Sequence, residues 1–354
     1  MTVSTVPDTS IVANPARELK RLMNRIADGE TLGEDGIRDA FDLLMSGIAP
    51  PVAMGAFLMG LRLRGETREE ITGAAKFMRS RMTTVDAPPG SIDIVGTGGD
   101  SRGTYNVSTA AALVAAGAGA IVAKHGNRAV TSLSGASDVL SALGVKLDVP
   151  PVIVSRAIAD AGVGFLWAPL YHPAMKTWAP VRADLGLRTI LNLLGPLCNP
   201  AEVKRQILGV YDKKLVQPLA EVLRKLGSEH AWIVHGADGM DELTTTGVTH
   251  VAELKNGDIF AFDLTPEDAG LPRSDIAALK GGDAATNAAA IRTLLQGEPG
   301  PYRDIVLLNT AAALIVAGKA DGLPDGIAKA AASIDSGRAA QALDRLVAVT
   351  NDTV

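Results

Sequence analysis

Short apolar segments that alternate with helical patterns constrain the fold of this 354-residue chain more than any other feature. They follow a change of composition at residues 86–90. They are IDIV at 92, AIVA at 120, GFLW at 164, QILGVY at 206 and HAWIVHG at 230. Apolar runs separated by helices are typical of βαβ units. The sequence therefore predicts an α/β fold with a mostly parallel central sheet flanked by helices.

The region before the sheet, residues 14–83, has a helical pattern. Leu19, Leu22, Met23 and Ile26 recur at helical spacing with basic residues between them. This predicts a small all-helical N-terminal domain. The apolar stripe serves either the core of that domain or a partner helix.

Composition excludes several classes of function. The net charge is −5, with a pI near 5.6, so the chain cannot neutralise a long run of phosphates and no nucleic-acid partner is expected. The single cysteine, Cys198, excludes an intrachain disulfide and a thiolate metal site. The N-terminus has neither a cationic start nor an apolar run, so we expect a cytoplasmic protein without a secretory signal.

One uncharged stretch, residues 103–123, is long enough to span a bilayer. Polar side chains at Thr104, Asn106, Ser108 and Thr109 argue against this reading. Uniformly apolar segments also occur in buried α/β cores. We expect a loop, a short buried helix over 108–116 and a strand ending near Ala123, with no membrane partner.

The first strand runs into a glycine-rich loop, GTGGDSRGTYNVST, at residues 96–109. Loops at the carboxyl ends of parallel strands and the helix N-termini that follow them attract anions. The loop is not a dinucleotide fingerprint, because GxGxxG starting at Gly96 would require glycine at Ser101. It predicts a phosphate-binding loop.

Two further strand ends carry polar groups. Lys124 to Ser132, KHGNRAVTS, places a cation, an imidazole, an amide and a guanidinium within five residues, which favours binding over a core role. The strand HAWIV is followed by Asp241 and Glu242, and adjacent carboxylates suit Mg²⁺. A glycine-containing segment separates these acids from their strand. This distinguishes them from the ribose-binding acids of type I phosphoribosyltransferases.

Two other segments have simpler readings. Residues 180–200 predict a helix followed by a proline-containing crossing loop. The Gly-Gly-Asp sequence at 98–100 recurs at 281–283, where it opens a helical segment and predicts a helix cap.

These three loops, together with APLYHPAMK at 168–176, VRADLG at 181–186 and NLLGPLCNP at 192–200, resemble the anthranilate phosphoribosyltransferase family. The resemblance covers nearly the whole chain. It implies a helical domain, residues 1–88 with the return segment 178–200, hinged to an α/β domain, residues 89–177 and 201–354. It also implies a homodimer formed through the helical domain. We expect the stripe through Leu19, Leu22 and Ile26 to make that contact.

The resemblance also implies roles for individual residues. Contacts to phosphoribosyl diphosphate are expected from Gly96, Gly99, Asp100, Thr104, Asn106, Val107, Ser108, Thr109, Lys124, Gly126, Arg128, Ser132 and Ala136. Anthranilate contacts are expected from Gly96, His125, Asn127 and Arg182, and His125 is a candidate catalytic proton acceptor. Ser108, Asp241 and Glu242 are expected to bind or anchor Mg²⁺. Two departures are Ser101, where glycine is usual, and Tyr105, where phenylalanine is usual. Ser101 would stiffen the loop if that position needs a positive φ.

The implied activity is the second step of tryptophan biosynthesis. Anthranilate attacks the anomeric carbon of phosphoribosyl diphosphate, and pyrophosphate leaves. Three alternatives stay open: a pyrimidine nucleoside phosphorylase of similar architecture, a divergent relative that binds nucleic acid, and a non-enzymatic scaffold. The acidic pair favours a diphosphate substrate, the net charge opposes nucleic acid, and a scaffold leaves the polar strand ends unexplained.

Overall fold

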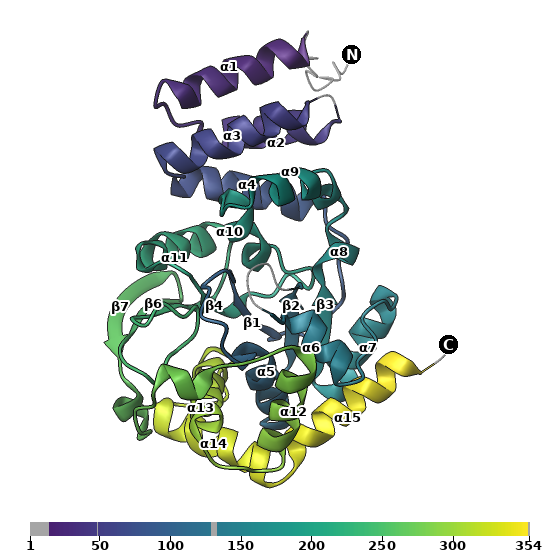
Figure 1. The fold of residues 1–354 in the computed structure, drawn as a ribbon, viewed down its shortest axis with the longest axis vertical. Coiled ribbons are helices and arrows are strands. Elements are labelled where there is room, and N and C mark those ends of the chain that lie inside the picture. The colour runs from purple at the N-terminus through teal and green to yellow at the C-terminus, as the bar shows by residue number, and fades with distance from the viewer. Residues whose placement is uncertain (1–13, 48, 129–132, 353–354) are drawn as a thin grey trace, which may run out of the picture.

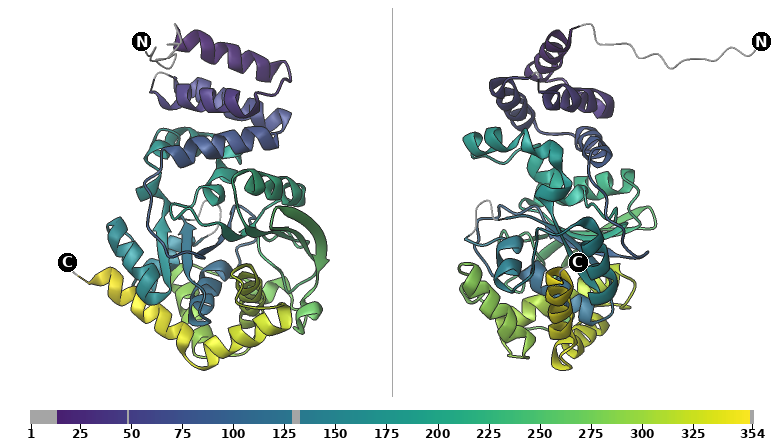
Figure 2. Two further views of the ribbon diagram at one scale, coloured as in Figure 1. Left: turned by 180° about the vertical axis from the view of Figure 1, so that it is seen from behind. Right: turned by 90° about the vertical axis from the view of Figure 1, so that its right-hand side faces the viewer.

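The computed structural model describes residues 14–47, 49–128 and 133–352. A stack of helices lies on one side of a twisted sheet, and a second group of helices covers the other side (Figure 1; two further views in Figure 2). This matches the predicted fold class.

The N-terminal part is helical, as predicted. Its helices are α1 (Pro15–Ala27), α2 (Gly33–Met45), α3 (Pro51–Arg64) and α4 (Arg68–Ser80). The Asn14 side chain accepts a hydrogen bond from the Arg17 backbone N–H and begins α1, and Thr67 forms a capping box with Glu70 at the start of α4. Glu70 is fully buried, where it also accepts from the Leu32 N–H at 2.8 Å.

The expectation that the α1 stripe contacts a second chain is wrong. Leu19, Leu22 and Ile26 are 7%, 1% and 5% exposed, because they pack into the core of their own domain. A different apolar row, on α3, is mostly exposed. Val52 and Leu63, at its two ends, are 78% and 81% exposed. Ala56 and Met59 stand between them at spacings of four, three and four residues, which puts the row on one face of the helix.

Within the described residues, the sheet has seven strands in the order β3-β2-β1-β4-β5-β6-β7. They are β1 (Ile92–Gly96), β2 (Val122–Gly126), β3 (Val163–Trp167), β4 (Arg205–Gly209), β5 (His230–Gly236), β6 (Thr249–Lys255) and β7 (Asp258–Leu264). The first five are parallel and confirm the predicted strands. The antiparallel pair β6–β7 was not predicted. From β1 the chain continues to β2 and β3 on one side of β1 and then crosses to β4 on the other side. The strand order therefore reverses at β1, and ligands of such sheets bind at this switch point.

Helices cover the sheet on the side away from the helical stack. They include α5 (Val107–Gly117), α12 (Ala284–Leu295), α13 (Pro301–Val316), α14 (Leu323–Asp335) and α15 (Arg338–Asn351), and α5 is held between α13 and α15. All residues of α5 except Ser108 are buried, which explains why the middle of the uncharged 103–123 stretch carries no charge. Through the parts of the chain described, every helix is too short or too polar to cross a bilayer.

The 180–200 segment differs from its prediction, because it contains two helices instead of one helix and a loop. They are α9 (Ala179–Leu185) and α10 (Ile190–Leu197), and Pro196 lies inside α10. They pack on α3 and α4, so the chain returns to the helical stack here, as the resemblance implies (Figure 1). The remaining elements are α6 (Ala136–Ala142), α7 (Pro151–Ala161), α8 (Ala168–Tyr171), α11 (Val216–Lys225), and the 3₁₀ turns η1 (Pro173–Lys176), η2 (Lys213–Leu215), η3 (Pro266–Ala269) and η4 (Ile276–Leu279).

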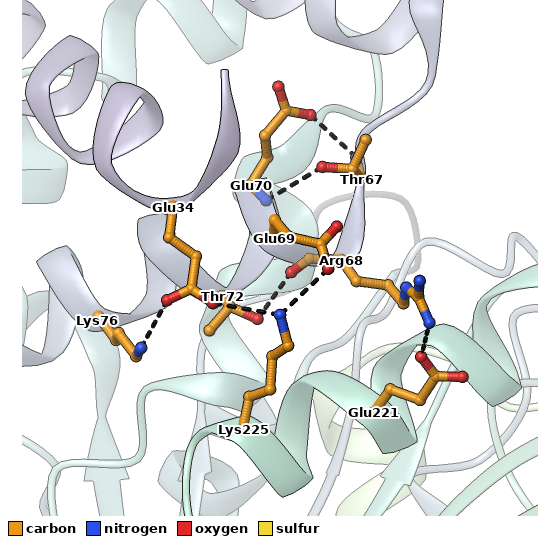
Figure 3. Close-up of polar contacts among 9 residues, drawn as sticks. All are labelled: Glu34, Thr67, Arg68, Glu69, Glu70, Thr72, Lys76, Glu221 and Lys225. Carbon is orange, nitrogen blue, oxygen red and sulfur yellow. Dashed lines mark hydrogen bonds and ion pairs between the residues drawn. The ribbon is translucent and has the colours of Figure 1, made fainter. Parts of the chain in front are cut away.

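Ion pairs join the helical stack to α11 of the sheet region (Figure 3). The Lys225 Nζ lies 3.1 Å from a carboxylate oxygen of Glu69 on α4 and 3.3 Å from one of Glu34 on α2. Arg68 of α4 also pairs with Glu221 of α11. These pairs lie at the surface, where each contributes at most about 1 kcal/mol, so they add little to the stability of the contact between the two parts.

Candidate active site

A cavity of about 440 Å³ lies between the helical stack and the carboxyl ends of β1 and β2. Sixteen of the predicted site residues line it: Gly96, Gly99, Asp100, Thr104, Asn106, Ser108, Thr109, Lys124, His125, Gly126, Asn127, Arg128, Ala136, Arg182, Asp241 and Glu242. Val107 is buried in the core behind it. Ser132 lies outside the described residues.

The glycine-rich loop has a backbone that other residues rarely adopt. Gly98, Gly99 and Gly103 have φ values of +66°, +76° and +63°. Ser101 shares this region at +58°, so the position where glycine is usual does require a positive φ. The serine therefore stiffens the loop, as expected for a positive φ at this position.

The loop that carries Asp241 and Glu242 packs directly on the glycine-rich loop, residues 96–109. The Asp241 Oδ2 accepts a hydrogen bond from the Gly98 N–H at 2.7 Å, and the Glu242 Oε1 accepts from the Ser108 N–H at 3.3 Å. Ser108, Asp241 and Glu242 are thereby brought together at the start of α5. From behind, Asn309 of α13 accepts from the Leu243 N–H at 3.1 Å and donates to the Leu243 carbonyl at 2.8 Å, which fixes the loop.

Glycines make this approach possible. A Cβ on Gly96 would lie 2.4 Å from the Asp241 Oδ2, and a Cβ on Gly209 would lie 1.7 Å from the Asp241 carbonyl oxygen. Both strands must therefore end in glycine for the acidic loop to reach the sheet.

The acidic pair is held at an energetic cost. Burial, with the charge of Asp100, raises the pKa of Asp241 to about 6, and burial, with the charge of Asp241, raises the pKa of Glu242 to about 8. Bringing a cation to these oxygens would relieve this unfavourable interaction. The two carboxylates and the Ser108 hydroxyl thus fit a hard divalent cation. Among the residues described, however, no cluster of three or more His, Cys, Asp or Glu side chains could hold a metal.

Lys124 and His125 occupy a different position from the one predicted. The strand continues to Gly126 instead of ending near Ala123, so both residues belong to β2 and are only 3% exposed. The Lys124 Nζ donates to the Ile94 carbonyl and, at 3.2 Å, to the Ser108 Oγ. Burial lowers the pKa of this ammonium, which nearby carboxylates oppose.

His125 forms a buried pair with His172. The His125 Nδ1 lies 3.0 Å from the Gly195 carbonyl oxygen, and a carbonyl only accepts, so Nδ1 carries the proton. The His125 Nε2 therefore accepts from the His172 Nε2–H at 3.2 Å. Burial lowers the pKa of His125 to about 3 and that of His172 to about 4, so both rings are neutral. The lone pair on the His125 Nε2 is thus already used as a hydrogen-bond acceptor.

Arg182 projects from α9 of the helical stack into the cavity. Burial lowers its pKa, and among the described residues it forms no ion pair with Asp184 or another acid, which favours a ligand-binding role over a paired surface arginine. Asn127 and Arg128 are exposed at the mouth, where the Arg128 guanidinium lies 5.8 Å from the Trp167 ring centre.

Several site residues were missed. His172 gave no signal, because a lone histidine in sequence is more often structural. Asp93 did give one, since it places a charge inside the apolar run IDIV. Its carboxylate accepts from the His125 N–H at 3.1 Å and from the Asn199 Nδ2 at 2.7 Å, fixing β2 against the return segment. Arg188 was not predicted either. Its guanidinium packs on Gly99 and lies 4.4 Å from the Tyr211 ring centre.

The chain is similar to known proteins in both sequence and structure. The chain matches two family models, the α/β domain of a glycosyl transferase family over residues 89–340 and its helical bundle domain over 20–82. It is 59% identical, over 94% of this chain and 98% of the relative, to an anthranilate phosphoribosyltransferase of Rhodopseudomonas palustris. The anthranilate phosphoribosyltransferase structure from Thermus thermophilus has a TM-score of 0.88 at 45% identity, covering 94% of this chain and 99% of that one. The Saccharomyces cerevisiae enzyme in complex with PRPP and Mg has a TM-score of 0.87 at 31% identity, covering 94% and 98%.

Proposed function

The chain belongs to the anthranilate phosphoribosyltransferase family and transfers the phosphoribosyl group to anthranilate in tryptophan biosynthesis, and on this premise we propose how its residues divide the work. The observation that carries the proposal is the junction at which Asp241 and Glu242 accept hydrogen bonds from the backbone of the glycine-rich loop. Two polar loops meet there at the start of a helix, where a diphosphate and a cation can be bound together.

We assign phosphoribosyl diphosphate to the α/β side of the cavity. Residues 96–109 offer backbone N–H groups in a loop whose glycines allow close approach, and the N-terminus of α5 adds its positive dipole end. Lys124 supplies a buried positive charge beneath the same loop. Gly126, Arg128, Ser132 and Ala136 would complete the contact from the second loop.

We assign Mg²⁺ to Ser108, Asp241 and Glu242, with water and the diphosphate completing its coordination. This fits the usual behaviour of Mg²⁺, which keeps several waters and takes few protein ligands. When bound, the ion would offset the charge of the departing pyrophosphate. The relative solved with PRPP and Mg supports the choice of metal.

We assign anthranilate to the helical side, where Arg182 can meet its carboxylate with paired hydrogen bonds. His125, Asn127 and the backbone of Gly96 would line the aromatic ring. The amine then lies between the two sides of the cavity, facing the anomeric carbon. The C–N bond forms as the C–O bond to pyrophosphate breaks, with positive charge shared by the ribose ring oxygen.

Proton removal from the amine follows the bond-making step, so it does not demand a strong base. His125 can accept that proton only if His172 turns away from its Nε2. We therefore keep His125 as a candidate acceptor and give its main role to substrate positioning.

Residues 1–88 with 178–200 would form the unit that closes on the α/β unit, bringing Arg182 to the diphosphate. We propose a homodimer through the helical unit, with the α3 row Val52, Ala56, Met59 and Leu63 as the contact; Met59 is half-buried and the other three are exposed. We also propose a cytoplasmic location.

The test is an assay of pyrophosphate release with anthranilate and phosphoribosyl diphosphate, with and without Mg²⁺. Release that requires anthranilate and is lost on chelation supports the assignment. A nucleoside phosphorylase would instead split pyrimidine nucleosides with inorganic phosphate, and that activity in the same preparation would contradict it.

A further inference from the structure

The second Gly-Gly-Asp sequence, residues 281–283, lies directly behind the first loop of the cavity. The Asp283 side chain accepts from the Thr286 backbone N–H at 2.8 Å and begins α12, which confirms the predicted cap. Gly281 and Gly282 have a different role from Asp283: they allow residues 279–282 to pack against residues 103–106.

Backbone groups make this contact. The Tyr105 N–H donates to the Leu279 carbonyl at 3.0 Å, and the Gly281 N–H donates to the Gly103 carbonyl at 3.0 Å. A Cβ on Gly281 would lie 2.6 Å from the Thr104 carbonyl oxygen, so any larger residue would push the loop toward the cavity.

Asn287, on the first turns of α12, extends the contact with its side chain. It is 1% exposed and does not line the cavity. Its Oδ1 accepts from the Gly282 N–H at 2.8 Å, and its Nδ2 donates to the Asn106 Oδ1 at 2.8 Å. Asn106 does line the cavity, and its Nδ2 donates to the Ser134 carbonyl at 3.3 Å.

We propose that Asn287 is a positioning residue for phosphoribosyl diphosphate, acting through Asn106. Its amide determines which end of the Asn106 amide is the acceptor and which is the donor, and so fixes the groups that Asn106 presents to the substrate. Without the Asn287 donor, the Asn106 oxygen loses its buried partner, and only the longer hydrogen bond from Nδ2 to the Ser134 carbonyl still orients the amide. This inference rests on the assignment of residues 96–109 to the diphosphate.

The experiment is a double-mutant cycle on Asn106→Ala and Asn287→Ala, with KM measured separately for each substrate. Loss of the hydrogen-bond donor to the half-buried Asn106 oxygen corresponds to about a tenfold rise in KM for phosphoribosyl diphosphate in Asn287→Ala. KM for anthranilate should stay within about twofold. In the Asn106→Ala background, adding Asn287→Ala should change KM less than about twofold, because the two residues act as one unit.

Two further variants separate positioning from stability. Asn287→Asp keeps an acceptor for Gly282 but cannot donate to Asn106, so it should raise the same KM; it also serves if the alanine variant fails to fold. Asp283→Ala removes the cap of the same helix without touching the loop. It should lower the thermal unfolding midpoint and leave both KM values unchanged.

The outcomes are distinguishable. Additive effects of Asn106→Ala and Asn287→Ala, or an equal rise in both KM values, would overturn the positioning role while leaving the diphosphate assignment in place. A normal KM for phosphoribosyl diphosphate in Asn106→Ala alone would contradict the assignment of the loop, and the inference would fall with it.

Discussion

The Cα of Gly209 faces the backbone carbonyl of Asp241 so closely that a Cβ on Gly209 would lie 1.7 Å from that oxygen. The last residue of β4 and the first acid of the third loop thus share a space that admits no side chain. The position of the acidic pair depends on this glycine as much as on the acids themselves.

Gly209→Ala should therefore displace the acidic loop and abolish most turnover. Forcing an extra methyl group into a packed interior costs about 1–3 kcal/mol of the free energy of unfolding. Steady-state kinetics and denaturant unfolding would measure both effects. Gly247→Ala is the matched control, since a Cβ there meets no atom within 4 Å. Normal activity in Gly209→Ala would show that the loop tolerates another position.

Replacing Asp241 with Asn and Glu242 with Gln should remove most Mg²⁺-dependent turnover while the fold persists. Because the pKa values of these acids are raised to about 6 and about 8, Mg²⁺ must compete with protons. The Mg²⁺ concentration for half-maximal activity should rise as the pH falls from 8 to 6. Glu267→Gln with Asp268→Asn, an exposed acidic pair elsewhere, should keep normal activity. Unchanged Mg²⁺ dependence in the first double variant would refute the metal assignment.

Arg182→Ala should weaken anthranilate far more than phosphoribosyl diphosphate. Loss of a charge-assisted contact of about 1.5–3 kcal/mol corresponds to a rise of roughly 10- to 150-fold in KM for anthranilate. Arg182→Lys keeps the charge but loses the planar guanidinium. Its KM for anthranilate should lie between those of the wild type and Arg182→Ala. Kinetics varying each substrate in turn decide the point, and equal impairment for both substrates would exclude the carboxylate role.

His172→Gln should change how stability depends on pH. The pKa of His172 in the folded protein, about 4, lies below its unfolded value near 6.5, so the unfolded chain takes up the proton first. The stability contributed by neutral His172 is present above pH 6.5 and is lost as the pH falls toward 4. The wild-type free energy of unfolding should therefore drop relative to the variant by up to about 1.4 kcal/mol per pH unit. Unfolding curves for both proteins at several pH values test this, and parallel pH profiles would contradict it.

Charges on the α3 row should separate the proposed dimer. Val52→Asp with Leu63→Asp should yield folded monomers in sedimentation experiments, because both side chains are exposed in the single chain. Leu22→Asp, on the buried α1 stripe, should unfold the helical domain instead. Phe260→Asp, at an exposed position on β7, should leave the dimer intact. A dimer that survives the α3 changes would place the interface elsewhere.

The sequence predicted the parts of the fold that depend on local pattern. The five parallel strands follow from apolar runs, and the glycine-rich loop follows from its position after one of them. The β6–β7 hairpin was not predicted because β7 is mostly exposed, with Leu264 its one buried residue, and its pattern, DIFAFDL, is not typical of a buried strand. The α1 stripe was assigned to a partner because an amphipathic helix alone does not say whether its apolar face is covered from within.

The site was predictable in its residues but less so in their setting. Lys124 and His125 look like loop residues because charged and polar groups rarely lie in the middle of a sheet. They are tolerated there because Ile94, Ser108, Gly195 and His172 satisfy their polar atoms. Partners so distant in sequence cannot be read from either segment alone. The same reason hid Asn287, whose partner Asn106 is 181 residues away.

The two hydrogen bonds between the Asn309 side chain and the Leu243 backbone also affect folding during synthesis on the ribosome. Gly98 and Asp241 are 143 positions apart, and another 66 separate Leu243 from Asn309. The glycine-rich loop leaves the exit tunnel long before Asn309, the residue that secures its acidic partner. A nascent chain therefore carries the glycine-rich loop without a secured acidic partner until Asn309 has emerged. Chains that terminate before residue 309 should lack a firmly held acidic loop even when the sheet strands are all present.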